Sequence, residues 1–381
     1  MKKILQVVSC LAKGGTEAFI MNNFRNIDRQ KYTFDFLVFT DIVDPMYADE
    51  IRELGGHIYC CMSPKLAHIN AFIKNAIGIM KDNGPYDAVH AHINIANAWI
   101  MYAAYKAGIR EIISHSHDIS CKETDNFIKK IYIKLQTHLI KKYSTIKLAC
   151  SELSGEYLYG KKSKTNQWHV IHNGIDIHKF INVSQGKVDE LRKIFSIENY
   201  KYVFGNITRF DENKNISFVV EVFNEILKKR PNSVLLLGGV DGGQLNMIKQ
   251  KVADNNLSDN VRFIGIRNDI EVCLKLMDTY IFPSFFEGLG IVSIEAQAAG
   301  IHCVCSNAVP LEADMDLNLI EFVDLKKSAG EWSDIIINTL NCRRPTNKEI
   351  IQEFIKRGYD INDSVKVLEK VYNGDWNEKE N

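Results

Sequence analysis

Short apolar runs alternate with helix-length segments along this chain, and no other feature of the sequence constrains the fold as strongly. In the first half the apolar runs are "KILQVVS", "YTFDFLVFT", "HIYCC", "YDAVHAH", "EIISHSH" and "TIKLAC". Segments such as "NAWIMYAAYKAG" and "NFIKKIYIKLQTHLIKKY" lie between them. Strands that alternate with helices form βαβ units, so this pattern predicts a parallel sheet covered by helices.

The alternation starts again in the second half with "YVFGNIT", "SVLLLGG", "VRFIG", "TYIFPS" and "HCVCS". A more polar stretch, from "VIHNGIDIHKFI" through "QGKVDELRKIF", separates the two series and is interpreted as a connection. A chain of 381 residues is long enough for two domains. We therefore predict two doubly wound α/β domains, residues 1–180 and 181–359, with a helix at about 360–381 that packs back on the first.

Composition excludes several classes of protein. The formal net charge is zero, and no basic stretch is interleaved with aromatic residues, which argues against nucleic acid as a partner. The nine cysteines form no C-x-x-C pair, so neither a zinc ribbon nor a disulfide framework is indicated, and a reducing cytoplasm is the simplest location. The start "MKKILQVVSCLAKGG" mimics a signal peptide, but its apolar part is short and is predicted to be a first buried strand.

The stretch "FFEGLGIVSIEAQAAG" carries two acids, Glu287 and Glu295, on either side of a glycine turn. Gly288 and Gly290 permit a tight turn after a strand, and the helix that follows offers free backbone N–H groups to an anion. Carboxylates would repel a bare phosphate, so they make sense as acceptors for hydroxyl groups beside it. An anion flanked by two polyhydroxylated groups describes a nucleotide sugar. The alternative is a surface loop with two solvated glutamates.

Two further strand-to-helix turns are candidates for binding phosphate. In "GNITRFDENKN", Arg209 and Lys214 could both reach a diphosphate, or they could simply be exposed cations in a loop. Gly14 and Gly15 follow the first strand and permit close approach of the backbone to phosphate or sugar. The segment "KGGTEA" matches neither the dinucleotide fingerprint nor the P-loop, so taken alone it favours an ordinary turn before a helix.

Histidines end two strands of the first domain, as His90 with His92 and His115 with His117. Alternate residues on a strand share a face, so each pair could hold a metal, as in a metal-dependent hydrolase. The other interpretation is that these histidines form hydrogen bonds with the backbone or with substrate. We prefer the second, because a metal site leaves the glutamates of the glycine turn and the two cations without a role.

These motifs together resemble the retaining GT-B glycosyltransferases of the group-1 (family 4) class. The resemblance rests on the two glutamates with "FPSFFEG" before and "EAQAAG" after, on "GNITRFDENKN", on "NGID" and on "GGTEAFI", and it spans nearly the whole chain. It is strongest to bacterial members that build capsular or exopolysaccharide. It implies two Rossmann-like domains facing across a cleft, with the nucleotide-sugar donor, UDP-linked by preference, held by the second domain. It implies a saccharide or lipid-linked acceptor, held by the first.

The resemblance also implies roles for single residues. By position, Arg209 and Lys214 neutralise the diphosphate, Glu295 binds the ribose and Glu287 binds the donor sugar, while His115 lies near that sugar. The remaining donor contacts implied by the resemblance fall on Gly14, Gly15, Gly265, Arg267, Gly288, Leu289, Gly290, Ile291 and Val292. Neither a metal nor another cofactor is expected. An epimerase or a sugar phosphorylase with the same architecture remains an alternative.

The segment "FIKKIYIKLQTHLIKKY" has an apolar helical face made by Ile128, Ile131, Tyr132, Leu135 and Leu139, and five lysines without an acid between them. One interpretation is an ordinary packed helix with a solvated lysine face. The other is a contact with an anionic membrane, because basic amphipathic helices bind such surfaces. The second predicts an enzyme bound peripherally to the inner face of the cell membrane.

Overall fold

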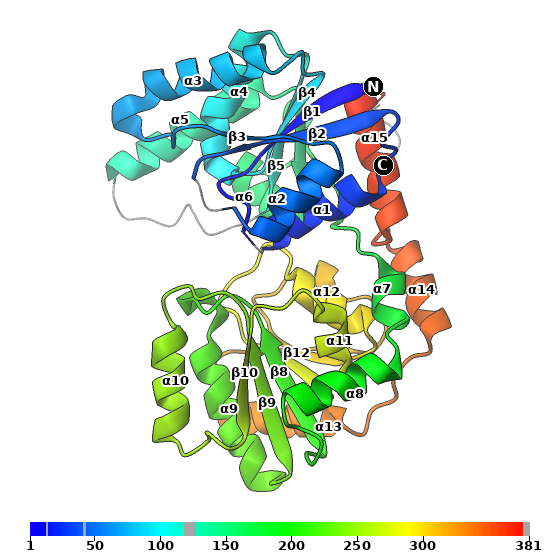
Figure 1. Ribbon diagram of the computed structural model, residues 1–381. Helices are drawn as coiled ribbons and strands as arrows, with labels where there is room; N and C mark the ends of the chain where they lie inside the picture. Colours follow the sequence, from blue (N-terminus) through cyan, green and yellow to red (C-terminus); the bar gives the residue numbers. More distant parts are fainter. Residues whose placement is uncertain (13, 41–42, 118–126, 376–381) are drawn as a thin grey trace. The chain divides into compact units, whose positions relative to one another are not determined.

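The structure is a computed structural model that describes residues 1–12, 14–40, 43–117 and 127–375 (Figure 1). The chain divides into two compact units. The first consists of Met1–Ile175 together with the segment that begins at Gly358, and the second is Asp176–Arg357. Each unit is an α/β domain built on a parallel sheet, as the alternating pattern predicts.

The sheet of the first unit, within the described residues, has the strand order β3-β2-β1-β4-β5-β6-β7. Ile4 of β1 pairs with Phe34 on one side and with Ala88 on the other, so β1 lies inside the sheet. The strands are β1 Lys2–Val7, β2 Tyr32–Val38, β3 Ile58–Cys60, β4 Ala88–Ala91, β5 Glu111–Ser116, β6 Ile146–Ala149 and β7 His169–Val170. This order is that of a Rossmann-type domain. The predicted strands are confirmed, including the signal-like N-terminal run as β1.

Helices pack against this sheet on both faces. They are α1 Gly15–Asn26, α2 Pro45–Glu53, α3 Ile69–Asp82, α4 Asn97–Ala107, α5 Phe127–Tyr143, α6 Glu152–Tyr159 and α15 Ile361–Asn373, with the short 3-10 helices Leu66–His68 and Asn94–Ala96. In one core cluster, Phe24 of α1 stacks on Phe34 with ring centroids 4.9 Å apart. A separate cluster buries Phe72 of α3 and Met101 of α4. Two apolar clusters are expected for a parallel sheet, since both of its faces must be covered.

The second unit repeats the same topology, with the strand order β10-β9-β8-β11-β12-β13 among its described residues. The strands are β8 Tyr202–Ile207, β9 Ser233–Gly238, β10 Val261–Gly265, β11 Thr279–Phe282, β12 His302–Ser306 and β13 Ile320–Val323. The helices are α7 Ile177–Ile181, α8 Gln185–Ile194, α9 Ile216–Lys229, α10 Leu245–Asp254, α11 Ile270–Lys275, α12 Ile291–Ala298, α13 Ala329–Thr339 and α14 Asn347–Lys356, with 3-10 helices Glu212–Lys214 and Leu311–Ala313. Its core buries Phe223 of α9 and Trp332 of α13 completely.

The last described helix, α15, belongs to the first unit, where it lies beside α1 (Figure 1). The backbone of Ile361 donates to the carbonyl of Ile175, and Ile175 donates to the carbonyl of Tyr359. A Cβ atom at Gly174 would lie 2.7 Å from Cβ of Ser364, so the glycine of "NGID" is needed for the close approach of α15.

The boundary between the units falls at Ile175 rather than at residue 180. Asp176 caps α7, its side chain accepting from the backbone of Lys179. Helix α7 then contacts α11, α12 and α14, all in the second unit. Its residues therefore belong to the second unit rather than to the first.

Three elements differ from the sequence-based expectation. The stretch "QGKVDELRKIF", interpreted as a connection, forms helix α8 and buries Val188 and Leu191. Strands β7 and β13 were not predicted, because they are two and four residues long and lack a continuous apolar run. Both add to the edge of a sheet, where pairing with a neighbour rather than local sequence makes the strand.

Candidate active site

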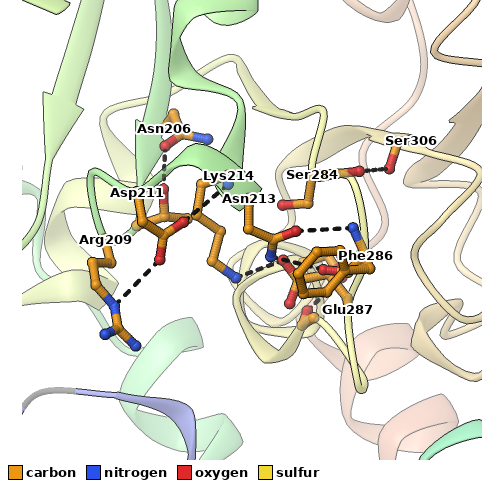
Figure 2. Close-up of polar contacts among 12 residues, drawn as sticks. Asn206, Arg209, Asp211, Asn213, Lys214, Ser284, Phe286, Glu287 and Ser306 are labelled. Atoms are coloured by element: carbon orange, nitrogen blue, oxygen red, sulfur yellow. Dashed lines mark hydrogen bonds and ion pairs between the residues drawn. The ribbon is translucent and has the colours of Figure 1, made fainter. Parts of the chain in front are cut away.

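In each unit all strands are parallel, so their carboxyl ends lie along one edge of the sheet, where open α/β sheets bind ligands. In the second unit the loops after β8, β9 and β11 meet at this edge. Figure 2 shows the polar contacts between the loop that follows β8 and the loop that follows β11.

The predicted glycine turn lies between β11 and α12. Gly290 caps α12 with φ of 77°, a left-handed conformation that favours glycine. A Cβ atom there would also lie 3.2 Å from the side chains of Phe282 and Val309. Because Gly290 has no side chain, it leaves the first N–H groups of α12 without a side-chain cap. The positive end of the helix is therefore available to an anion, with Ile291 and Val292 in its first turn.

Lys214 and Glu287 form an ion pair across the two loops. The Nζ atom of Lys214 donates to Oε1 of Glu287 over 2.5 Å, and the two side chains are only 21% and 10% exposed. Lys214 is positioned by the 3-10 turn that ends at it, and Asp211 caps that turn by accepting from the Lys214 backbone. The structure thus brings together two residues that sequence analysis assigned to different motifs.

Asn213 joins the two loops and was not singled out from the sequence. Its backbone carbonyl and its side-chain oxygen accept from the backbones of Phe285 and Phe286, and its side-chain nitrogen donates to the carbonyl of Phe286 over 2.9 Å (Figure 2). These contacts fix the backbone next to Glu287. The only sequence signal that pointed to it was its place between Arg209 and Lys214 in "RFDENK".

Arg209 lies on the same loop as Lys214 but does not join the Lys214–Glu287 pair. Its Nε atom lies 3.4 Å from Asp211, and its side chain is 64% exposed. A Cβ atom at Gly242 would lie 3.0 Å from the side chain of Arg209 and 2.8 Å from that of Asp211, which is too close for ordinary packing. The glycine-rich loop after β9 is therefore a neighbour of Arg209 that sequence analysis missed, although "GGVDGG" is a visible signal for close backbone approach.

Glu295 is a partly buried residue in the second turn of α12. Burial raises the pKa of its carboxyl to about 7, while Lys179 lowers the pKa and Glu271 raises it. Lys179 of α7 and Glu271 of α11 form their own ion pair, with Nζ and Oε2 3.1 Å apart. These two charged residues both act on the Glu295 carboxyl and were not identified from the sequence.

Gly265 and Arg267, two of the predicted donor contacts, lie at the end of β10 and in the loop after it. Gly265 adopts φ of 70° and a Cβ atom added there would meet nothing within 4 Å, so the backbone is open on that side. The guanidinium of Arg267 makes two hydrogen bonds to Asp269, of 2.8 and 2.5 Å, and lies 5.3 Å from the ring centroid of Phe195. The Arg267 side chain is therefore already engaged, which leaves the backbone as the available contact.

The histidines of the first unit form a buried group at the carboxyl ends of β4 and β5. One ring nitrogen each of His90, His92 and His115 lies within 4.8 Å of the others, a spacing that could hold a metal ion. Most of these nitrogens already have partners, because His90 contacts His115 over 3.1 Å and His92 contacts His117 over 2.9 Å. Burial lowers the pKa of all four and brings that of His117 to about 3, so the rings are neutral near pH 7.

The glycine pair of the first unit lies where the sequence placed it, between β1 and α1. Gly15 starts α1, and Gly14 precedes it in an extended conformation with φ of −153°. A Cβ atom at Gly14 would lie 2.6 Å from Oε2 of Glu17. The absence of a side chain at Gly14 thus accommodates the Glu17 carboxylate at the start of the helix.

Helix α5 carries an exposed surface of mixed apolar and basic character. Ile128 and Ile131, two residues of the predicted apolar face, are 77% and 53% exposed. These two side chains are therefore not packed against the rest of the described protein. We call this the α5 surface, and it consists of Phe127, Ile128, Lys130, Ile131, Lys134, Leu135 and Lys141. Among the described residues, no helix combines the length and apolar character that crossing a bilayer requires.

Two family descriptions match this chain one after the other. Residues 13–179 match "Glycosyltransferase Family 4", and residues 187–357 match "Glycosyl transferases group 1". The two matched ranges correspond closely to the two structural units.

Curated relatives match over most of the chain. It is 31% identical over 374 residues to the putative glycosyltransferase EpsF of Bacillus subtilis, a match that covers 98% of this chain and 96% of that relative. It is 28% identical over 307 residues to the UDP-Gal:alpha-D-GlcNAc-diphosphoundecaprenol alpha-1,3-galactosyltransferase of Escherichia coli, covering 75% of each. These likenesses do not support the metal-dependent hydrolase that the histidine pairs raised as an alternative.

A solved structure shares the fold. Anabaena HepE in complex with UDP-glucose matches with a TM-score of 0.79 at 18% identity, over 98% of this chain and 100% of that one. The predicted architecture, two Rossmann-like domains with parallel sheets as in GT-B proteins, is therefore confirmed.

Proposed function

This chain belongs to the group 1 glycosyltransferases, and we infer that it transfers a hexosyl group with retention from a UDP-linked sugar to a saccharide on a lipid diphosphate. The observation that carries the donor part is the Lys214–Glu287 pair at the carboxyl edge of the second sheet. A cation and a carboxylate side by side, next to the uncapped start of α12, suit a ligand in which a phosphate adjoins hydroxyl groups.

The diphosphate is assigned to the cationic side of this group. Lys214 and Arg209 supply two positive charges, and the first turn of α12 adds backbone N–H groups from Ile291 and Val292. When the bond between the sugar and the diphosphate breaks, negative charge develops on the leaving phosphate. Donors placed there stabilise the transition state more than the bound substrate, and each is worth about 3 kcal/mol.

The hydroxyl groups of the donor are assigned to the acids. Glu287 accepts from the sugar, while its contact with Lys214 holds the ammonium in place before the donor arrives. Glu295 lies one helical turn further along α12 and accepts from the ribose. The segment Gly288–Gly290 adds backbone contacts to phosphate and sugar. In the first unit, His115 is assigned to a sugar hydroxyl.

Retention follows if the acceptor hydroxyl attacks from the face that the diphosphate leaves. The departing phosphate oxygen then takes the acceptor proton, and no covalent glycosyl-enzyme is needed. No metal is included in this scheme, because Lys214, Arg209 and the start of α12 provide the positive charge at the diphosphate.

Names of similar proteins support the choice of donor and acceptor. HepE binds UDP-glucose, and the E. coli relative is named for a UDP-linked donor and a diphosphoundecaprenol acceptor. The α5 surface supports a lipid-linked acceptor independently, since its apolar residues with lysines among them match an anionic leaflet. We therefore place the reaction at the cytoplasmic face of a membrane.

A thermal-shift panel of UDP, GDP, ADP and CMP with their sugar conjugates tests the donor assignment. A ligand at a hundred times its Kd stabilises the folded protein by about 2.7 kcal/mol, so UDP and one UDP-sugar should raise Tm most. The selected UDP-sugar is then incubated with lipid-diphosphate saccharides. Sugar on the lipid with release of UDP supports the proposal, whereas an epimerised nucleotide sugar or a free sugar phosphate supports the alternatives. A panel in which no uridine nucleotide shifts Tm would refute the donor assignment.

A further inference from the structure

A buried hydrogen-bond network connects the four histidines to Gln6 of β1 and Tyr372 of α15. The side-chain nitrogen of Gln6 lies 3.1 Å from the Tyr372 hydroxyl, and its side-chain oxygen lies 2.9 Å from Nε2 of His92. Tyr372 contacts Nδ1 of His90 over 2.9 Å. Gln6 and Tyr372 are each 1% exposed, and both lie in the first unit although 366 positions separate them.

Each member of this network has a fixed number of protons. Burial lowers the pKa of the four imidazoles, so each ring is neutral and carries a single N–H. Burial also raises the pKa of Tyr372, so its hydroxyl keeps one proton. With one proton per group, the direction of each hydrogen bond determines the direction of the next.

One branch of the network starts at the amide oxygen of Gln6 and runs through His92 to His117. The amide oxygen can only accept, so His92 donates from Nε2 and its Nδ1 carries no proton. His117 must then donate from Nε2 to Nδ1 of His92. This leaves Nδ1 of His117 as a bare acceptor.

The second branch starts at the amide nitrogen of Gln6 and runs through Tyr372 and His90 to His115. Its hydrogen bonds are donated in the opposite direction, away from Gln6. The amide nitrogen can only donate, so Tyr372 accepts from it and gives its own proton to Nδ1 of His90. His90 therefore donates from Nε2 to Nδ1 of His115. His115 must carry its single proton on Nε2, which becomes a donor.

The two branches thus end in nitrogens of opposite kind. If the Gln6 amide were turned over, every bond would reverse, and His115 would end as the acceptor and His117 as the donor. One donor and one acceptor result in either case, because a single amide has one of each. Both end nitrogens are buried, and neither has a hydrogen-bond partner among the described residues.

We propose that Gln6 and Tyr372 are positioning residues that make His115 a donor and His117 an acceptor for a single sugar hydroxyl group. A hydroxyl both accepts and donates, so it satisfies the two nitrogens together. A phosphate oxygen would leave the His117 acceptor without a proton, and an ammonium group would leave the His115 donor without an acceptor. The proposal rests on the glycosyl-transfer function, since it names the chemical group that these histidines bind.

The surroundings favour one small polar group. The rings of His115 and His117 have centroids 4.0 Å apart, so the two histidines lie side by side. The Phe19 ring lies 5.1 Å from His115 and 5.4 Å from His117, so an apolar side chain covers the pair. An unpaired donor and acceptor beside an apolar ring cost free energy until a ligand satisfies them, which favours binding of a hydroxyl.

Imidazole nitrogen NMR of the full chain tests the network without reference to activity. Long-range proton–nitrogen correlation distinguishes protonated from bare ring nitrogens. With Gln6 oriented as in the structure, His90, His92, His115 and His117 should all be neutral at pH 7 with the proton on Nε2. The reversed amide would place all four protons on Nδ1, which would keep the network but overturn the assignment of His115 as donor and His117 as acceptor. A mixture of the two tautomers, or an imidazolium in the group, would overturn the network itself.

Tyr372→Phe tests the positioning role, because it cuts the second branch and leaves the first intact. The His115 signals should then report both tautomers, while those of His117 stay unchanged. Loss of one oriented hydrogen bond should lower kcat/KM about tenfold. Tyr32→Phe is the matched control: its hydroxyl also contacts α15, through Asn373 over 2.9 Å, but among the described residues this hydroxyl has no hydrogen bond to the histidines. It should leave the His115 signals and the kinetics as in the wild type.

Two assays identify the source of the hydroxyl. Hydrolysis of the UDP-sugar selected by thermal shift needs no acceptor, so a Tyr372→Phe defect there assigns the hydroxyl to the donor. A defect confined to transfer assigns it to the acceptor. If His115 changes tautomer but both assays are unaffected, the pair binds only water and the proposal is wrong. If all four histidines show one and the same tautomer but the protein transfers no sugar, the network is retained and the proposed function is rejected instead.

Gln6→Met provides a second variant, since it removes the origin of both branches while keeping the side-chain length. Both His115 and His117 should then lose their single tautomer. Retention of wild-type tautomers in this variant would show that Gln6 does not set them.

Discussion

Nζ of Lys214 lies 2.5 Å from Oε1 of Glu287, although 73 positions separate the two residues in the sequence. The pair is mostly shielded from solvent, so each charge depends on the other for compensation before a ligand binds. We expect that the diphosphate and the sugar hydroxyls take over these contacts, with Lys214 turned to the phosphate and Glu287 to the sugar.

Glu287→Gln should lower kcat/KM for transfer by about a hundredfold or more. The amide keeps the size of the side chain but loses the charge that holds Lys214 and accepts from the sugar, and losses of this kind are typical for groups that stabilise a transition state. Lys214→Met should have a similar effect. Because the two residues act as a unit, the double variant should lose less than the product of the single losses.

A matched control for this pair lies on α9, where Lys228 and Glu225 are 2.6 Å apart and their side chains are 61% and 30% exposed. Glu225→Gln should leave transfer unchanged. Near-normal turnover in Glu287→Gln would instead remove this residue from the active site.

Arg209→Ala should also lower transfer by about two orders of magnitude, because it removes a positive charge assigned to the leaving diphosphate. Its exposed guanidinium contacts only Asp211 among the described residues, so the fold should tolerate the change and Tm should stay close to that of the wild type. Arg230→Ala is the control, since this residue precedes β9 and lies at the opposite edge of the sheet. Equal activity of the two variants would contradict the assignment of Arg209.

Nucleotide-sugar binding should weaken as pH falls through about 7, the raised pKa of Glu295. Above this pH the carboxylate accepts from the ribose hydroxyls, whereas below it the protonated form loses acceptor capacity, so Kd should rise by up to about tenfold per pH unit. The diphosphate of a nucleotide sugar is esterified at both ends and does not titrate in this range. Calorimetric titration between about pH 6 and 8 measures the effect.

Glu295→Gln separates this carboxyl from other titrating groups. It should bind the nucleotide sugar more weakly, and its Kd should no longer change with pH. A Kd for this variant equal to that of the wild type would refute the ribose contact.

Transfer should survive EDTA, because the positive charge at the diphosphate is assigned to side chains and backbone N–H groups. Loss of activity that Mg²⁺ or Mn²⁺ restores would contradict a metal-independent mechanism. Elemental analysis of the purified protein adds a second measurement. Stoichiometric zinc or iron would return the group of His90, His92 and His115 to consideration as a metal site.

The α5 surface should bind liposomes that contain anionic lipid, more weakly as salt rises, and should not bind neutral liposomes. Each lysine near an anionic leaflet contributes about 1 kcal/mol. Replacing Lys130, Lys134 and Lys141 with Gln should therefore abolish most binding in a sedimentation assay while the Kd for UDP stays unchanged.

Replacing three exposed lysines of the second unit, Lys187, Lys193 and Lys249, removes the same charge and serves as the control. This variant should bind anionic liposomes as the wild type does. If the wild type does not bind them even at low salt, the α5 surface has no role at a membrane.

Much of the local structure was determined by the sequence itself. Alternation of apolar runs with helical segments predicted both parallel sheets, because the periods of strands and helices are local properties of the backbone. The glycine turn before α12 was predictable for the same reason, since the left-handed φ of Gly290 favours glycine. Placement of Glu287, Arg209 and Lys214 after strands then followed from the rule that ligands bind at the carboxyl edge.

Contacts between distant segments were decided only by the tertiary structure. The Lys214–Glu287 pair and the clamp made by Asn213 exist because β8 and β11 are neighbours in the sheet, and the strand order is not encoded in any local pattern. The link from His90 through Tyr372 to Gln6 exists because α15 returns to the first unit after the whole of the second. Hydrogen bonds depend on positions within a few tenths of an ångström, which result from the packing of the whole domain rather than from the order of its residues.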